Sequence, residues 1–252
     1  MIKNLVVSGC SFTAVENARG HPWSKVTAEH FGLTYHNLAH VGAGNTYICN
    51  SVIDYLEAKQ FDPAETLVLA MWSGPSRKDL RVSYEYWNSL KTYKFKFNSA
   101  KYHHDSYYVG SCGRSNAWYE NSDAKQLFQM MYLSSDPATI CKDSLVNFVN
   151  LDDYLKVRGY NYKFTSFYNQ WQEDIECTDF GEYILEYYVK DLPIYKNFNF
   201  NSWFFINESK DSLWEYAKQH QLLADDGFHP SVEAHKQFAQ EYVIPIIEGY
   251  IK

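Results

Sequence analysis

The chain has no long hydrophobic run. None of its apolar stretches approaches the roughly 20 residues that a membrane-spanning helix requires. The apolar stretch nearest the start, Leu5-Val6-Val7, is also too short for the core of a signal peptide. We therefore expect a protein that retains its N-terminal segment, does not contact a membrane and works in the cytoplasm. The same features are compatible with a virion-associated protein.

Positive charge is also scarce. The 252 residues include 23 Lys and Arg against 30 Asp and Glu, which gives a net charge of −7. A surface that binds nucleic acid needs a basic patch or stripe, so this balance argues against nucleic acid as a partner. The sequence does not predict an oligomeric state.

Cysteine occurs without a recognisable pairing pattern. The number of cysteines is odd and no Cys-x-x-Cys spacing occurs, which argues against a zinc knuckle and against a disulfide framework. Free thiols in a reducing compartment are the expected state of these side chains. The five positions are Cys10, Cys49, Cys112, Cys141 and Cys177.

The first 72 residues do contain a regular alternation of strand and helix patterns. Residues 4–9, 34–39 and 66–72 have the composition of strands. Residues 22–31 and 46–59 have the pattern of helices, with Asn45 as the N-cap of the second. This alternation favours right-handed βαβ units and a parallel sheet. The continuous apolar run within 66–72 predicts the central strand, because both faces of such a strand are buried.

Aromatic residues make up 18% of the chain and concentrate in its middle. Residues 76–122 break the alternation and predict an insertion over one sheet edge, and residues 168–200 predict a second irregular insertion. Elsewhere we expect helices at 123–133 and 211–222, strands at 163–167 and 203–206, and a last helix capped by Ser231. A further helix is expected to begin with Ser135-Asp136-Pro137, an N-cap with proline at an early helical position, and to run to Arg158. The apolar face of the last helix is predicted to consist of Ala234, Phe238, Tyr242 and Ile246. Without a repeat or linker, residues 1–252 are predicted to form one domain.

Two short motifs at opposite ends of the chain carry the chemistry. Gly9-Cys10-Ser11-Phe12-Thr13 follows the first strand, where a sharp turn would present the Ser11 hydroxyl at the carboxyl edge of the sheet. Asp226-Gly227-Phe228-His229-Pro230-Ser231 opens the last helix, and its aspartate can orient the histidine three residues later. Serine, histidine and aspartate are the three parts of an acyl-transfer triad. Taken alone, the second motif is also typical of a loop that ends in a helix N-cap.

With both motifs and the α/β alternation between them, the chain resembles the SGNH (GDSL-like) hydrolase family. The resemblance implies a three-layer α/β/α sandwich with a short parallel sheet of flavodoxin-like kind. It also implies Ser11 as nucleophile, His229 as general base and Asp226 as the carboxylate that orients the base. Cys10 replaces the Asp of the family's Gly-Asp-Ser; we expect a small buried thiol there, and a thiol nucleophile is the alternative. The variant motif, with Trp72-Ser73-Gly74-Pro75-Ser76-Arg77, is similar to SGNH-like proteins of phages and bacteria.

The family's second and third sequence blocks supply oxyanion donors. The stretch 37–45 resembles the second block, and its spacing favours the N–H of Gly42, with Gly44 as the alternative; both glycines also suit a tight turn. The third block in the family is Gly-x-Asn-Asp, and this chain has no asparagine there. Ser73 lies nearest to that place, so the N–H groups of Ser11 and Gly42 with Ser73 form the predicted oxyanion hole. The alternatives to Ser73 are Ser76 and Arg77.

These observations together predict the hydrolysis of an O-acyl ester, such as an acetate on a carbohydrate, without a cofactor or a metal. His103-His104-Asp105 has no second ligand cluster and predicts a solvated loop. A carbohydrate-binding module with little or no activity and an O-acyltransferase that uses the same residues are alternative functions. The rings of the first insertion are predicted to contact the substrate, or alternatively to form a small core of their own; they are Tyr84, Tyr86, Trp87, Trp118 and Tyr119.

Overall fold

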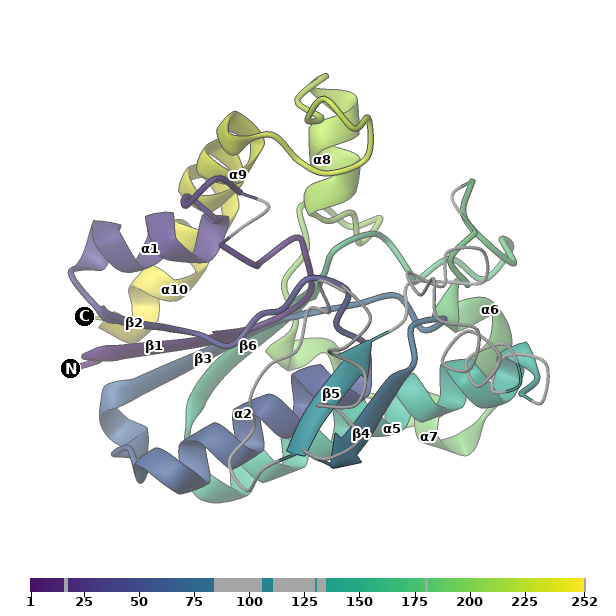
Figure 1. Cartoon of the computed structure of the whole chain (residues 1–252), viewed down its shortest axis with the longest axis horizontal. Coiled ribbons are helices and arrows are strands. Elements are labelled where there is room, and N and C mark those ends of the chain that lie inside the picture. Colours follow the sequence, from purple (N-terminus) through teal and green to yellow (C-terminus); the bar gives the residue numbers. More distant parts are fainter. Residues whose placement is uncertain (16–17, 84–105, 111–129, 131–134, 180, 252) are drawn as a thin grey trace.

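A four-stranded parallel sheet forms the centre of the protein (Figure 1). The computed structural model describes residues 1–15, 18–83, 106–110, 130, 135–179 and 181–251. The carboxyl ends of parallel strands meet at one edge of a sheet, which is where such folds bind their ligands. In spatial order the strands are β2 (Thr34–Asn37), β1 (Asn4–Ser8), β3 (Thr66–Trp72) and β6 (Asn161–Ser166).

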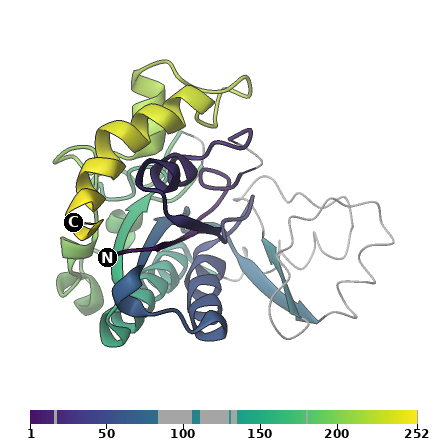
Figure 2. The ribbon, with the colours of Figure 1, turned by 90° about the vertical axis from the view of Figure 1, so that its left-hand side faces the viewer.

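Helices cover both faces of this sheet (Figures 1 and 2). One face carries α1 (Trp23–Phe31) and a C-terminal helical segment; the other carries α2 (Asn45–Lys59) and α5 (Pro137–Arg158). The C-terminal segment consists of α9 (Val232–Phe238), the π-helical turn η3 (Ala239–Val243) and α10 (Ile244–Ile251). The predicted three-layer α/β/α sandwich with a short parallel sheet is therefore confirmed. Within the described ranges, no helix combines the length and apolar character needed to cross a membrane.

Two further strands lie outside the central sheet. β4 (Asp79–Ser83) and β5 (Ser106–Gly110) pair antiparallel and belong to the predicted 76–122 insertion. The rest of that insertion beyond residue 83 lies outside the described residues, as does nearly all of the helix expected at 123–133. The other short elements are η1 (Pro63–Glu65), α6 (Leu185–Val189), α7 (Pro193–Lys196), η2 (Phe200–Ser202) and α8 (Leu213–Gln219).

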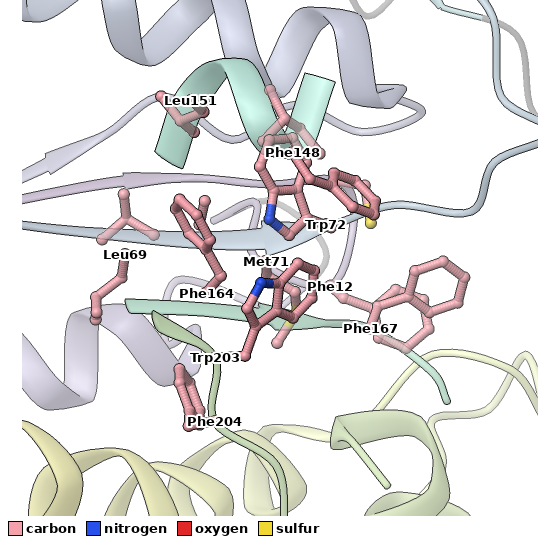
Figure 3. Packing of buried hydrophobic residues seen from close by; sticks show 14 of the residues in the cluster. Phe12, Leu69, Met71, Trp72, Phe148, Leu151, Phe164, Phe167, Trp203 and Phe204 are labelled. Carbon is pink, nitrogen blue, oxygen red and sulfur yellow. The ribbon is translucent and has the colours of Figure 1, made fainter. Parts of the chain in front are cut away.

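The core lies along β3, which is buried at every position. β1 and β6 flank this strand and helices cover both of its faces, so an all-apolar strand is the expected solution. The ring of Trp72 lies 4.4 Å from Phe148 of α5, and Phe148 lies 5.4 Å from Trp203 (Figure 3). Replacing such a buried ring by alanine typically costs about 3–5 kcal/mol. This packing fixes the end of β3, from which Ser73 follows.

The strand expected at 203–206 is wrong. Trp203 forms only a single bridge to Phe164 of β6. The chain then leaves the sheet, because the N–H of Ile206 donates to Asp211 in a turn. In the second insertion, Trp171 packs 5.6 Å from Phe198 and 5.0 Å from Trp203, so these rings form a local core beside the sheet.

The predicted apolar face of the last helix is correct only in its first half. Ala234 and Phe238 are buried, but beyond them Val243 and Ile247 are buried in place of Tyr242 and Ile246. The π-helical turn η3 causes this change, since a π turn contains an extra residue and rotates the following face by one position. Ser231 caps the helix as expected, accepting the N–H of Ala234 at 3.2 Å.

Candidate active site

A tight turn after β1 presents Ser11. The carbonyl of Cys10 accepts the N–H groups of Thr13 at 2.9 Å and Ala14 at 3.0 Å, which folds the chain back and leaves Ser11 at the bend. Gly9 is required for this turn: a Cβ there would lie 2.5 Å from the hydroxyl of Thr13 and 3.1 Å from the carbonyl of Met71. The close approach of position 9 to Thr13 and to β3 therefore requires glycine there.

Cys10 points into the core. Its side chain is 0% exposed and belongs to the main apolar cluster. The expectation of a small buried thiol is confirmed, and the alternative of a thiol nucleophile at this position is wrong.

A second tight turn, between α8 and α9, holds Asp226 and His229. One carboxylate oxygen of Asp226 accepts the N–H groups of Phe228 and His229, both at 2.9 Å. The other oxygen lies 2.6 Å from Nδ1 of His229. The N–H of Ala224 closes the turn by donating to the carbonyl of His229 at 2.7 Å. The imidazole is therefore fixed by its own turn, as the Asp-x-x-His spacing predicts.

The two turns meet. Nε2 of His229 lies 3.0 Å from Oγ of Ser11. A carboxylate can only accept, so the hydrogen on the His229 ring belongs on Nδ1, facing Asp226, and Nε2 is left to accept the Ser11 hydroxyl. The structure thus brings together all three residues of the predicted triad, with the imidazole between the hydroxyl and the carboxylate.

The local electrostatics suit this arrangement. Burial raises the pKa of the Asp226 carboxyl, but the two N–H donors and the imidazole of His229 outweigh burial and bring the pKa below its usual value. The group is therefore a carboxylate across the ordinary pH range. A negative charge beside Nδ1 would stabilise an imidazolium if Nε2 took a proton.

Aromatic rings surround the imidazole, and sequence reasoning missed them. The ring of Phe12 lies 5.2 Å from that of His229, and Phe228 lies 5.1 Å from it at a steep angle. Phe167, which follows β6, supports Phe12 at 4.5 Å. These contacts restrict the rotation of the histidine ring. The only available signal was their place beside the motif residues, because Phe12 follows Ser11 and Phe228 precedes His229.

The segment after β2 lies against the turn that carries Ser11. The N–H of His40 donates to the carbonyl of Gly9 at 3.0 Å. The amide of Asn37 donates to the carbonyl of Thr13 at 3.0 Å and accepts the N–H of Ala39 at 2.8 Å. Both contacts fix the start of the glycine-containing turn, residues 40–44, beside Ser11.

The two glycines of that turn differ in their partners. The N–H of Gly44 donates to Asp79 at 2.8 Å, so this alternative donor is already engaged. Gly42 is buried with a φ of 80°, and among the described residues no acceptor pairs with its N–H or with that of Ser11. Buried N–H groups without a partner are rare in proteins, and these two belong to the residues predicted to form the oxyanion hole.

Ser73 leaves the sheet at the same edge as Ser11. β1 and β3 are parallel neighbours with Ser8 opposite Ala70, so the segments that carry Ser11 and Ser73 both follow strands that end at this edge. The Ser73 hydroxyl is buried and has no hydrogen-bond partner among the described residues. Both alternatives at this block contact Glu182: the Ser76 hydroxyl bonds to its carboxylate, and Nε of Arg77 lies 3.4 Å from the same carboxylate. The Arg77 guanidinium also lies 4.9 Å from the ring of Phe167.

Asn45 does not cap α2, so that expectation is wrong. Gly44 occupies the N-cap position. The Asn45 side chain instead accepts the N–H of Ser73 at 2.8 Å and donates to its carbonyl at 3.1 Å. Asp79 takes over the end of the helix by accepting the N–H groups of Gly44 and Tyr47, both at 2.8 Å. Burial raises the pKa of Asp79 to about 6, although these two N–H donors lower it.

Several predicted positions cannot be placed. The five rings predicted to contact substrate lie outside the described residues, and so does His103-His104-Asp105. In the part of the chain that the structure describes, no three His, Cys, Asp or Glu side chains gather in a way that could hold a metal ion.

No protein-family model matches the chain, and no curated protein matches its sequence. Among solved structures, the chain is similar to the psychrotrophic esterase EstA from Pseudoalteromonas sp. in a structure inhibited by monoethylphosphonate. The TM-score is 0.52 at 10% identity, and the match covers 99% of this chain and 98% of that chain. A candidate acylhydrolase from Bacteroides fragilis aligns over 99% of this chain and 88% of its own, with 14% identity and a TM-score of 0.44. The likeness to EstA shows a shared fold, which agrees with the fold implied by the SGNH resemblance.

Proposed function

We propose that this protein is a serine ester hydrolase of SGNH type. One observation carries the proposal: the unbroken contact from the Ser11 hydroxyl through the His229 imidazole to the Asp226 carboxylate. These three groups come from positions as far as 218 residues apart, and a loop cap alone has no reason to face a serine hydroxyl. The fold shared with an esterase supports the same reaction class.

The reaction follows from the contacts. Oγ of Ser11 attacks the ester carbonyl while Nε2 of His229 takes the hydroxyl proton, and Asp226 holds the ring in the tautomer that can accept it. The imidazolium then returns the proton to the leaving alcohol, which leaves an acyl group on Ser11. Water, activated by the same imidazole, releases the acid and restores the serine.

The developing oxyanion needs donors near Ser11. The N–H groups of Ser11 and Gly42 are proposed for this role, because neither has a partner among the described residues. The Ser73 hydroxyl, also without a partner there, is the proposed replacement for the family's asparagine. A replacement donor is important here, because loss of one oxyanion donor lowers the rate by about 10²–10³.

The proposed substrate is an O-acetyl ester on a carbohydrate. Its support is compositional: the first insertion contains Tyr84, Tyr86, Trp87, Trp118 and Tyr119, and such rings offer flat apolar faces that suit sugars. If they bind the sugar, replacing them raises KM for an acetylated polysaccharide and leaves a small activated ester unaffected. Equal losses on both substrates would assign these rings to folding.

The test of the proposed function is hydrolysis of p-nitrophenyl acetate by wild type, Ser11→Ala and Ser24→Ala. Ser24 is a matched control because it is also buried and its hydroxyl bonds to Tyr35 at 2.8 Å. We expect Ser11→Ala to lose all turnover while it keeps the wild-type circular dichroism spectrum. Ser24→Ala is expected to retain turnover. Equal turnover by wild type and Ser11→Ala would refute the proposal.

A further inference from the structure

Two side chains connect the start of α2 with the segment between β3 and β4, one from each segment. Asn45, the first residue of α2, reaches to the end of β3 and bonds to both backbone groups of Ser73. Asp79, the first residue of β4, reaches back and accepts the N–H groups of Gly44 and Tyr47 at the start of α2. We call this pair of contacts the clasp. It joins the glycine turn 40–44 to the β3–β4 connection.

The clasp holds the two segments at close range. A Cβ on Gly44 would lie 2.7 Å from a carboxylate oxygen of Asp79 and 2.8 Å from the carbonyl of Arg77, so only glycine allows this approach. Asn45 is 2% exposed, and its amide also donates to the hydroxyl of Ser144 on α5 at 3.1 Å. Its side chain is therefore fully engaged and is not available to bind an oxyanion.

The bonding pattern of Asn45 fixes orientation as well as distance. Its amide accepts from the N–H and donates to the carbonyl of one residue, so the Ser73 backbone is held at two points. A single bond would leave rotation about that bond. The predicted donor groups of the oxyanion hole lie at the two ends of the clasp: Gly42 is two residues before Gly44, and Ser73 is itself the residue held.

We propose that Asn45 and Asp79 are positioning residues that set the separation between the Gly42 N–H and Ser73 around the oxyanion site. This inference rests on the proposed esterase function. Neither residue contacts substrate; both act through the segments that carry the donors. Oxyanion donors are effective only when they lie about 2.7–3.1 Å from the position that the oxyanion will occupy, so small displacements of these segments lower the rate of the chemical step.

If Asn45 and Asp79 only stabilised α2, loss of another buried polar contact of this helix would affect kcat in the same way. Helix α2 is also attached to the sheet by the hydrogen bond between Ser51 and the Ser8 hydroxyl of β1, at 2.8 Å and fully buried. That bond lies in the same helix, away from the glycine turn. Ser51→Ala is therefore the matched control for loss of a buried polar contact of α2.

The experiment measures kcat and KM for p-nitrophenyl acetate in the full chain, well below each variant's melting temperature. We expect Asn45→Ala and Asp79→Ala to lower kcat about 10- to 100-fold with KM within about twofold of wild type. Asp79→Asn keeps one acceptor oxygen and is expected to fall between Asp79→Ala and wild type. Ser51→Ala is expected to keep the wild-type kcat.

A double variant adds a readout that general destabilisation does not produce. If both side chains set one distance, the kcat losses of Asn45→Ala and Asp79→Ala do not multiply, because the first loss already releases the spacing. If Asn45→Ala fails to fold, the cycle is built from Asn45→Asp and Asp79→Asn instead. Each of these substitutions retains part of the bonding.

The outcomes separate the two claims. Wild-type kcat in the folded Asn45 and Asp79 variants would refute the positioning role of the clasp and leave the proposed function intact. An equal kcat loss in Ser51→Ala would also overturn it, because the effect would then belong to α2 as a whole. A wild-type protein that neither hydrolyses the ester nor reacts at Ser11 with a fluorophosphonate would overturn the proposed function, and the clasp with it.

Discussion

Nε2 of His229 lies 3.0 Å from Oγ of Ser11, although 218 residues separate them in the chain. Ser11 follows β1, and His229 precedes the last helical segment. The parallel α/β architecture brings these two loops together at one edge of the sheet. The contact is what distinguishes a proposed hydrolase site from two unrelated turns. The predictions below test what this contact and its surroundings do.

Asp226→Asn is expected to lower kcat by about 10²–10⁴-fold without unfolding the protein. The amide can donate to Nδ1 and so favours the wrong imidazole tautomer for accepting the Ser11 proton. Asp225→Asn is the matched control, since Asp225 is its chain neighbour, is fully exposed and pairs with the exposed side chain of Arg19 at 3.5 Å, outside the contacts of His229. Similar rates for the two variants in steady-state ester hydrolysis would remove Asp226 from the mechanism.

Glu215→Gln is expected to flatten the pH dependence of stability between about pH 4.5 and 7. Burial raises the pKa of Glu215 in α8 to about 7 from 4.5, against the N–H donors of Asn169 and Ser212. The folded state therefore holds a proton that the unfolded chain releases, so stability declines as pH rises through this window. At about 1.4 kcal/mol per pKa unit, the decline amounts to roughly 3 kcal/mol.

Urea denaturation at several pH values measures this slope, with the exposed Glu208→Gln as control. Glu208→Gln should reproduce the wild-type slope. A wild-type curve that is flat over the window, or a Glu215→Gln curve as steep as wild type, would contradict the prediction.

His235→Gln is expected to act in the opposite sense. Burial, together with the nearby charge of His229, lowers the pKa of His235 to about 3 from 6.5. The unfolded chain then binds a proton that the folded state excludes, so this group makes the protein lose stability as pH falls from about 6.5 toward 3. The variant should lose less stability over that range. The exposed His21→Gln should behave as wild type in the same denaturation series, and an unchanged acid slope in His235→Gln would refute the assignment.

The local sequence predicted those parts of the fold that depend on local rules. The run Thr66–Trp72 formed the central strand because it is continuously apolar, and Asp136 and Ser231 capped their helices because capping involves neighbours within three residues. The Ser11 and Asp226–His229 turns could be found for the same reason: each is a compact motif whose shape is set by its own backbone bonds.

Long-range polar contacts could not be predicted in this way. Asn45 has every local feature of an N-cap, yet its amide bonds to Ser73, 28 residues later, and a carboxylate from Asp79 serves the helix end instead. The run 203–206 has strand composition, but the N–H of Ile206 donates to the carbonyl of Asp211 in a turn. The extra residue of η3 likewise depends on how the last helix packs, and its sequence gives no sign of it.

Labelling with a fluorophosphonate, followed by mass mapping of the modified peptide, tests the central claim most directly, because it reports whether any serine is activated without assuming a substrate. The account predicts one adduct on the native protein, located on Ser11, absent in Ser11→Ala and formed more slowly in His229→Gln. An unlabelled native protein, or an adduct on another serine with Ser11 unmodified, would contradict it.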